Sequence, residues 1–252
     1  MRRLATVTAI ILLTILILPA YSPQAAALTA DEILNRVDEN MYAKSSVIEA
    51  EMTITYKDRV VKKQLHIENE GKDKAYSEFL APERDKGIKY LRLGDNLWMY
   101  HPGVNRVINI AGHQLRQSAN GSDFSYEDMM ERSKKLQDRY TAQIAGNEQL
   151  GGRPSIVLDL EAKVSGITYY RIKMWVDSEY FIALREEYYA KSGKLLKYLQ
   201  NGDIQKYGSR YYPIRITVKD VIRDASTTEM VLKKVQFDVP LGENAFSRDR
   251  LH

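Results

Sequence analysis

The feature that most constrains the fold is an alternation of apolar and polar residues that returns in short runs along the chain. From Val47 onward, Glu and Thr residues alternate with an apolar set, namely Ile48, Ala50, Met52, Ile54 and Tyr56. The same pattern returns at 61–67, 156–162, 170–176, 182–188 and 214–218. A period of two is typical of a β-strand with one buried face. The chain is therefore predicted to be mainly β.

Short turn signals separate these runs and predict how the strands are connected. Examples are Gly94-Asp95-Asn96, Gly151-Gly152, Ser192-Gly193 and Asn201-Gly202. They divide the chain into about ten or eleven strands. Parallel neighbours would need long crossovers, so short turns predict an antiparallel meander. Because nearly every strand has one apolar face, the sheet has to curl into a barrel or half-barrel or pack on another element.

The first segment that departs from the β pattern is a helix near the start. Thr29 followed by Glu32 forms a capping box, in which each side chain bonds the other residue's backbone N–H. Apolar residues then recur at helical spacing, namely Ile33, Leu34, Val37 and Met41. The spacing predicts a helix packed on the core.

The second departure is an insertion midway through the meander. Residues 111–122 are polar and contain two glycines, and Ser125 with Asp128 resembles a second capping box. Helical spacing then continues to about Arg139 through Met129, Met130, Ser133 and Leu136. We expect this loop and helix to lie across the covered face or the mouth of the sheet.

Residues 1–27 have the three parts of a secretory signal peptide. Arg2 and Arg3 precede an apolar run from Leu4 to Leu18, and small residues end at Ala27, the expected cleavage site. The alternative is a retained anchor, for which a run of about 15 residues is short. Residues 28–252 show no linker composition and are predicted to form a single domain, which in a bacterium with two membranes is periplasmic.

Composition argues against several classes of function. Cysteine is absent, which excludes thiolate catalysis, disulfides and a lipidated N-terminal Cys. The 37 Lys and Arg are interspersed with 33 Asp and Glu, so we expect no nucleic-acid partner. No metal-binding His spacing, GxSxG elbow or P-loop is present, and the neighbours Glu186 and Glu187 point to opposite faces of a strand. We predict a protein that is not an enzyme, without a metal ion or cofactor.

The apolar face itself is the remaining candidate site. A curved sheet of this size encloses more volume than one or two modest helices fill, which favours a ligand cavity. The alternative is a face filled by the protein's own side chains. The strand alternation predicts the cavity lining as Ile48, Met52, Ile54, Leu65, Ile67, Leu158, Leu160, Ile172, Met174, Leu184, Ile214 and Ile216.

Four blocks of sequence resemble a known family. They are 86–102, 105–110, 121–128 (GlySerAspPheSerTyrGluAsp) and 175–177 (TrpValAsp). With them the mature chain resembles the outer-membrane lipoprotein-sorting family, which is similar to the LolA and LolB carriers. The resemblance implies an unclosed antiparallel β-barrel covered by lid helices, with an apolar cavity. It also implies a carrier that binds the acyl chains of a lipid or lipoprotein and moves it toward the outer membrane, in some members with an RND-type exporter.

The carrier hypothesis assigns roles to the insertion. Its apolar side chains are expected to occupy the empty cavity and to move on loading as a lid, namely Phe124, Met129, Met130 and Leu136. Arg106 and Arg116 are expected at the mouth, where they would meet a phosphate or carbonyl. The expected partners are a lipid or acylated lipoprotein, an inner-membrane exporter and an outer-membrane acceptor.

Two other classes of function stay open. One is a periplasmic sensor of mislocalised lipoproteins, which shares this fold but needs a further C-terminal domain. The chain ends at His252, soon after 241–246, and this disfavours the sensor. The other is a non-catalytic scaffold whose sheet face is simply covered by helices. The missing N-terminal Cys favours a shuttle over an anchored receptor.

Overall fold

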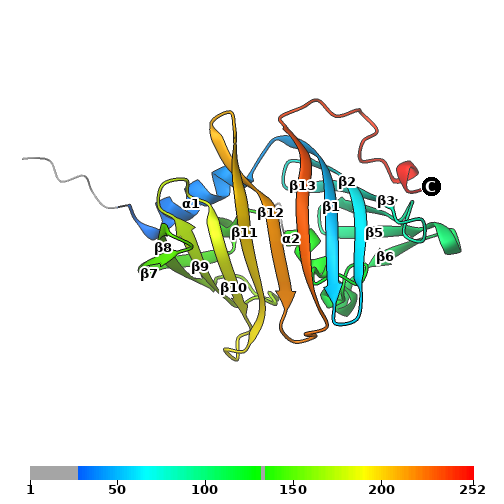
Figure 1. Ribbon diagram of the computed structural model, residues 1–252. Helices are drawn as coiled ribbons and strands as arrows, with labels where there is room; N and C mark the ends of the chain where they lie inside the picture. The colour runs from blue at the N-terminus through cyan, green and yellow to red at the C-terminus, as the bar shows by residue number, and fades with distance from the viewer. Residues whose placement is uncertain (1–27, 132–133) are drawn as a thin grey trace, which may run out of the picture.

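The computed structural model describes residues 28–131 and 134–252, and its strands form one antiparallel sheet (Figure 1). The strand order is β6-β5-β4-β3-β2-β1-β13-β12-β11-β10-β9-β8-β7, so β6 and β7 are its two edges. The strands are β1 Ser45–Tyr56, β2 Val60–Glu70, β3 Lys74–Ala81, β4 Lys89–Leu93, β5 Asn96–His101, β6 Arg106–Ile110, β7 Tyr140–Leu150, β8 Arg153–Ala162, β9 Arg171–Asp177, β10 Ala183–Tyr189, β11 Leu195–Tyr207, β12 Arg210–Asp220 and β13 Ser226–Phe237. This is the unclosed, mainly β fold that the sequence predicted.

The chain enters the sheet in its middle and leaves it there. It runs from β1 to the β6 edge, crosses to the β7 edge, and returns strand by strand to β13, which pairs with β1. Apart from β6 and β7, all strands that are consecutive in the chain are antiparallel neighbours in the sheet, which confirms the meander. The sequence estimate of ten or eleven strands is low, since the sheet has 13 strands. Edge strands such as β7 are exposed at most positions and carry no clear alternation.

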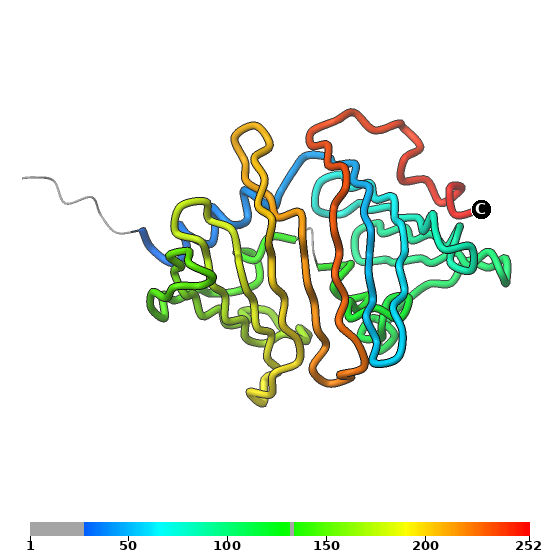
Figure 2. Tube along the Cα trace, viewed as in Figure 1, coloured from blue at the N-terminus to red at the C-terminus, as the bar shows by residue number. Residues whose placement is uncertain are grey.

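Both helices lie on the same side of the sheet, whose edges curl around them (Figures 1 and 2). The helices are α1 Ala30–Met41 and α2 Tyr126–Glu131, and the 3₁₀ turns are η1 Pro102–Val104, η2 Gly112–Arg116, η3 Leu136–Asp138 and η4 Arg248–Leu251. Helix α1 packs on β7–β10, and α2 belongs to the insertion between β6 and β7. Among the described residues, no helix has the length and apolarity needed to cross a membrane. The predicted signal peptide, residues 1–27, lies outside the described residues.

The capping box predicted for α1 is confirmed. The N–H of Thr29 donates to Oε2 of Glu32 over 2.8 Å, and the N–H of Glu32 donates to Oγ1 of Thr29 over 3.2 Å. Each bond satisfies a backbone donor that has no partner within the helix. The apolar stripe of α1 is buried through Ile33, Leu34 and Val37, each at most 2% exposed.

The buried side chains form two clusters on the inner face. The first covers β1–β6, β12 and β13 together with the insertion. The second joins α1 to the other half of the sheet through Ile33, Leu34, Val37, Tyr140, Leu158, Leu160, Ile172, Met174, Val176 and Ala183. The helix therefore fills one half of the concave face, and the other half is left to the insertion.

The predicted helix of the insertion starts where expected but is shorter. The N–H of Ser125 donates to Oδ2 of Asp128 over 2.6 Å, and the N–H of Asp128 donates to the Ser125 hydroxyl over 3.1 Å. The prediction that helix continues to Arg139 is wrong, because α2 ends at Glu131 and η3 follows. Lys135 is extended there, with ψ 132°, which breaks a continuous helix. Ser133, part of the predicted helix, lies outside the described residues.

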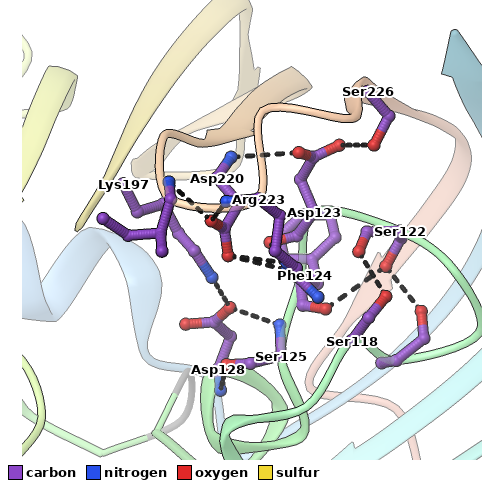
Figure 3. Close-up of polar contacts among 12 residues, drawn as sticks. Ser118, Ser122, Asp123, Phe124, Ser125, Asp128, Lys197, Asp220, Arg223 and Ser226 are labelled. Atoms are coloured by element: carbon purple, nitrogen blue, oxygen red, sulfur yellow. Dashed lines mark hydrogen bonds and ion pairs between the residues drawn. The ribbon is translucent and has the colours of Figure 1, made fainter. Parts of the chain in front are cut away.

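A buried carboxylate, Asp123, holds the insertion to the turn between β12 and β13 (Figure 3). Its Oδ2 accepts from the hydroxyls of Ser226 and Thr228 over 2.8 and 2.7 Å. Its Oδ1 accepts from the N–H of Asp220 over 3.0 Å, and its own N–H donates to the Thr228 hydroxyl over 2.8 Å. Asp123 is 2% exposed, so these bonds are shielded from water. They fix the residue that precedes Phe124 against the sheet.

Replacing Asp123 tests this attachment. In Asp123→Ala the two hydroxyls and the N–H of Asp220 lose a buried acceptor, and we expect the free energy of unfolding to fall by about 3 kcal/mol. Urea denaturation measures the change. Asp58→Ala is the control, because the Asp58 side chain is 72% exposed and pairs only with exposed Arg59, which makes a change of about 0–1 kcal/mol the expectation. Equal stability of both variants would contradict the role of Asp123.

Candidate functional site

A cavity of about 200 Å³ lies between the insertion and the half of the sheet that α1 leaves uncovered. Its apolar lining comes from β1–β5, β12, β13 and the insertion. These side chains include Ile48, Met52, Leu65, Ile67, Tyr76, Phe79, Tyr90, Leu97, Ala119, Phe124, Met129, Tyr212, Met230, Leu232 and Phe237. The end of α1 and the chain that follows it border the cavity with Met41, Tyr42 and Ala43. The lining is therefore apolar on the sheet side and is completed by two segments that cross the sheet.

All the predicted cavity residues except Leu184 lie in one of three places. Those that line the cavity are Ile48, Met52, Leu65 and Ile67. Those that pack in the first cluster, outside the lining, are Ile54, Ile214 and Ile216. Those of the second cluster, beneath α1, are Leu158, Leu160, Ile172 and Met174. Strand alternation identifies the inner face but does not tell which half of it a helix fills.

Leu184, also predicted to line the cavity, sits at an irregularity of β10. The register between β10 and β9 shifts between Ala183 and Arg185, so Leu184 is the extra residue of a bulge. Ala183 packs in the second cluster, whereas Leu184 is buried outside both clusters. A bulge changes the parity of a strand, and no residue of this strand signals it in the sequence.

The insertion brings two of its predicted side chains to the cavity. Phe124 and Met129 line it. Met130 is buried in the first cluster, and Leu136 packs against the second. The insertion thus contacts both halves of the concave face, and its middle part faces the cavity.

The charged residues that line the cavity differ from those predicted for its mouth. Arg106 and Arg116 are exposed and lie outside the lining that the described residues form. The lining cations are instead Arg92 of β4 and Lys134 and Lys135 of the insertion. Arg92 shares the alternation of Tyr90, and this parity is the sequence signal that places it inside.

The Arg92 guanidinium is held by backbone carbonyls. The side chain is 1% exposed, and it donates to the carbonyl of Met130 over 2.5 Å and to the carbonyl of Lys72. Burial lowers the pKa of Arg92 from its ordinary value, but an arginine keeps its charge in proteins. A buried positive charge therefore lies at the wall of the cavity and ties α2 to the sheet.

A buried seam of polar groups attaches the other side of α2. The Asp128 carboxylate accepts from the ammonium of Lys197 on β11 (Figure 3). It also accepts from the Tyr169 hydroxyl over 2.8 Å. Lys197 is only 4% exposed. Burial raises the pKa of Tyr169 well above its ordinary value, so its hydroxyl stays protonated and donates. Asp123 and Asp128 together fasten both ends of the block 121–128.

Asp38 of α1 holds the far end of the insertion. Its two carboxylate oxygens accept from the N–H groups of Leu136 and Gln137, each over 3.0 Å. The residue is 5% exposed, and this burial raises the pKa of the carboxyl above its ordinary value of 3.8. Asp38 also lines the cavity. The buried Asp38 carboxylate therefore links helix α1 to the insertion, beside the packing of Leu136 against the second cluster.

The raised pKa of Asp38 predicts a pH effect on stability. Below pH 3.8, the ordinary pKa of the carboxyl, the contribution of Asp38 to the free energy of unfolding is fully present. This contribution is lost as the pH rises from 3.8 through the raised pKa, because over that range the folded state binds more protons than the unfolded state. We expect the free energy of unfolding of the wild type, minus that of Asp38→Asn, to fall across this window. Urea denaturation at a series of pH values measures it. A difference that is constant or that grows with pH would be inconsistent with the shift.

Three solved structures share this fold. A DUF1329 family protein from Desulfovibrio piger is 24% identical, covers 88% of this chain and 98% of its own, and has a TM-score of 0.82. A putative outer membrane lipoprotein-sorting protein domain from Vibrio parahaemolyticus is 22% identical, covers 88% and 97%, and has a TM-score of 0.77. A LolA superfamily protein from Nitrosomonas europaea is 21% identical, covers 88% and 99%, and has a TM-score of 0.73.

Comparison at the level of sequence gives a family. No curated protein matches the chain. A family model described as "Uncharacterized protein" matches residues 71–252, which include β3–β13 and the whole insertion. Among the described residues, no three His, Asp or Glu side chains gather as a metal site would require. The chain belongs to this family of uncharacterized proteins, and its fold is that of the LolA superfamily and of outer-membrane lipoprotein-sorting domains.

Proposed function

We propose that the protein is a periplasmic carrier that binds an acyl chain of a lipid or lipoprotein in this cavity and moves it toward the outer membrane. The observation that carries the proposal is the apolar cavity between the insertion and the open half of the sheet. An inner-membrane exporter that loads the carrier and an outer-membrane acceptor that unloads it complete the proposed route. The signal-peptide pattern of residues 1–27 supports a periplasmic location.

The chemistry of the lining suits an acyl chain. Transfer of each CH₂ group from water to an apolar site contributes about 0.8 kcal/mol, or on the order of 12 kcal/mol for a 16-carbon chain. Met52, Met129 and Met230 line the cavity, and unbranched methionine side chains adapt to varied apolar shapes. The cavity can therefore hold chains that differ in length or branching.

The size of the cavity implies that the carrier adjusts on loading. Its volume of about 200 Å³ is below the roughly 300–1,000 Å³ of typical ligand sites. Phe124 and Met129 project into this space from the insertion. We therefore include in the proposal that these two side chains move aside when a full acyl chain enters. In the empty protein they cover apolar surface that would otherwise face water.

Analysis of co-purified lipid tests the proposal directly. The protein is purified from a periplasmic fraction, extracted with organic solvent, and the extract is compared by mass spectrometry with that of a mock purification. We expect phospholipid or fatty acid enriched to about one molecule per chain. A clean extract, together with no uptake of a fluorescent acyl probe, would favour a scaffold whose concave face is filled by its own side chains.

A charge placed in the cavity is expected to abolish uptake. In Met129→Asp, an acyl chain has to pack against a carboxylate, and we expect the affinity for a fluorescent acyl probe to fall at least about tenfold. Met130 is left intact because it is buried in the first cluster. Val164→Asp is the control, since Val164 is 41% exposed outside the cavity. Native far-UV circular dichroism with unchanged probe affinity in Met129→Asp would exclude the proposed site.

A matched pair of leucines separates the cavity from the second cluster. Leu65 and Leu158 are both buried, at 5% and 0% exposure, but only Leu65 lines the cavity. Truncation to Ala is expected to lower the free energy of unfolding by about 2–5 kcal/mol in each case. Under conditions where both variants are folded, we expect titration with the acyl probe to show altered affinity for Leu65→Ala alone. Equal effects on binding would place the acyl chain elsewhere.

A further inference from the structure

The cavity is polar at one end and apolar along the rest, and the strand register shows where the change occurs. Ser46, Asn69, Ala75 and Arg92 are direct neighbours across β1, β2, β3 and β4. The Asn69 amide donates to the Ser46 hydroxyl over 3.0 Å. This row, which we call the polar row, lies where β1 begins and β2 ends. Its members carry a hydroxyl, an amide and a guanidinium to the wall of the cavity.

The rows that follow are mostly apolar. Two residues farther along β1, Ile48 pairs with Ile67, and two residues beyond, Ala50 pairs with Leu65, which pairs with Phe79. Leu65 and Phe79 are at most 5% exposed, whereas Asn69 and Gly71 at the polar end are partly exposed. Solvent therefore reaches the polar end beside Asn69 and Gly71, whereas Ser46 and Arg92 of the polar row are 5% and 1% exposed.

Two lysines of the insertion border the polar end. Lys134 and Lys135 both line the cavity. The Lys135 ammonium lies 5.7 Å from the centre of the Tyr42 ring. The Lys134 ammonium lies 3.0 Å from the carboxylate of Asp95, which is 90% exposed, so solvent screens that pair. It also lies 3.6 Å from the carboxylate of Glu131. Arg92 adds a third positive charge from the sheet side.

The two carboxylates of the lining are already engaged. Asp38 accepts from the N–H groups of Leu136 and Gln137, and Asp128 accepts from Lys197 and Tyr169. The lining thus has three cations, Arg92 and the two lysines, against these two bonded carboxylates. Among the lining residues the balance of charge favours a negatively charged group, which would compete with Asp95 and Glu131 for Lys134.

We infer that the cavity takes an amphiphile with one anionic head group, a carboxylate or a phosphate, which lies at the polar row beneath Lys134 and Lys135. The tail runs over the Ile48–Ile67 row toward Leu65 and Phe79. This inference rests on the proposed function and gives it a substrate class: a fatty acid or an anionic phospholipid in preference to the uncharged diacylglyceryl group of a lipoprotein. Charge-assisted hydrogen bonds from the lysines would select the head group.

Competition binding with paired amphiphiles tests the inference. The full chain is loaded with a fluorescent acyl probe and titrated with palmitate, hexadecanol, palmitoyl lysophosphatidate and monopalmitoylglycerol. Within each pair the chain is matched in length, and one member carries an anionic group where the other carries a hydroxyl. We expect each anionic member to bind at least about tenfold tighter than its neutral partner. The two anionic arms distinguish a carboxylate from a phosphate.

Variants locate the head group. In Lys134→Gln/Lys135→Gln we expect the preference for the anionic members to fall to about threefold or less, while affinity for hexadecanol is unchanged. Lys62→Gln is the matched control, because Lys62 is exposed and, beside the inward Lys63, faces the other side of β2. This control is expected to keep the full preference. If the two lysines only supported the structure, the double variant would bind the anionic amphiphiles and hexadecanol more weakly to the same extent.

The outcomes separate the inference from the proposed function. Equal binding of charged and neutral amphiphiles, or a preference that survives in the double variant, would overturn the anionic head group but leave the acyl carrier intact. No binding of any of the four compounds or of the probe would overturn the proposed function as well. A preference that is lost only in the lysine double variant supports both.

Discussion

An open sheet that is apolar on one face has to cover that face, and this requirement organises the whole molecule. The strands from β6 to β7 do not close on themselves, so their inner side chains are buried only by what crosses the concave side. Helix α1 covers β7–β10 and the insertion covers the other half. The two coverings differ in kind: the helix presents a continuous apolar stripe and fills its half, whereas the short insertion leaves space beneath it.

Buried carboxylates hold the loose covering in place without filling the cavity. Asp123 joins the insertion to the β12–β13 turn, Asp128 joins it to β11, and Asp38 joins it to α1. Each carboxylate accepts hydrogen bonds from groups that would otherwise be buried without an acceptor. Because a partly satisfied buried network is costly, each attachment stabilises the fold only while all of its hydrogen bonds are made. The arrangement fixes the ends of the insertion, and Phe124 and Met129 line the cavity between these attachments.

Much of this architecture follows from local patterns in the sequence, because those patterns are set by the backbone. Strand parity identified the inner face, and the pairs Thr29–Glu32 and Ser125–Asp128 marked the two helix starts. The location of the cavity on that face did not follow, since Leu65 and Leu158 have the same pattern and differ only in what packs above them. The bulge at Leu184 depends on tertiary contacts in the same way, whereas the parity that Arg92 shares with Tyr90 does signal its inward position.

The pairing of β1 with β13 also determines when the protein can fold. Ser46 lies opposite Phe237, so the centre of the sheet joins residues from the two ends of the chain. During synthesis, the side of β1 that pairs with β13 stays an unpaired edge until nearly all of the chain has emerged. Contacts of such long sequence separation form slowly and expose nascent strands to aggregation. The same topology that gives the protein an open concave face therefore delays completion of its sheet until β13 has formed and paired with β1.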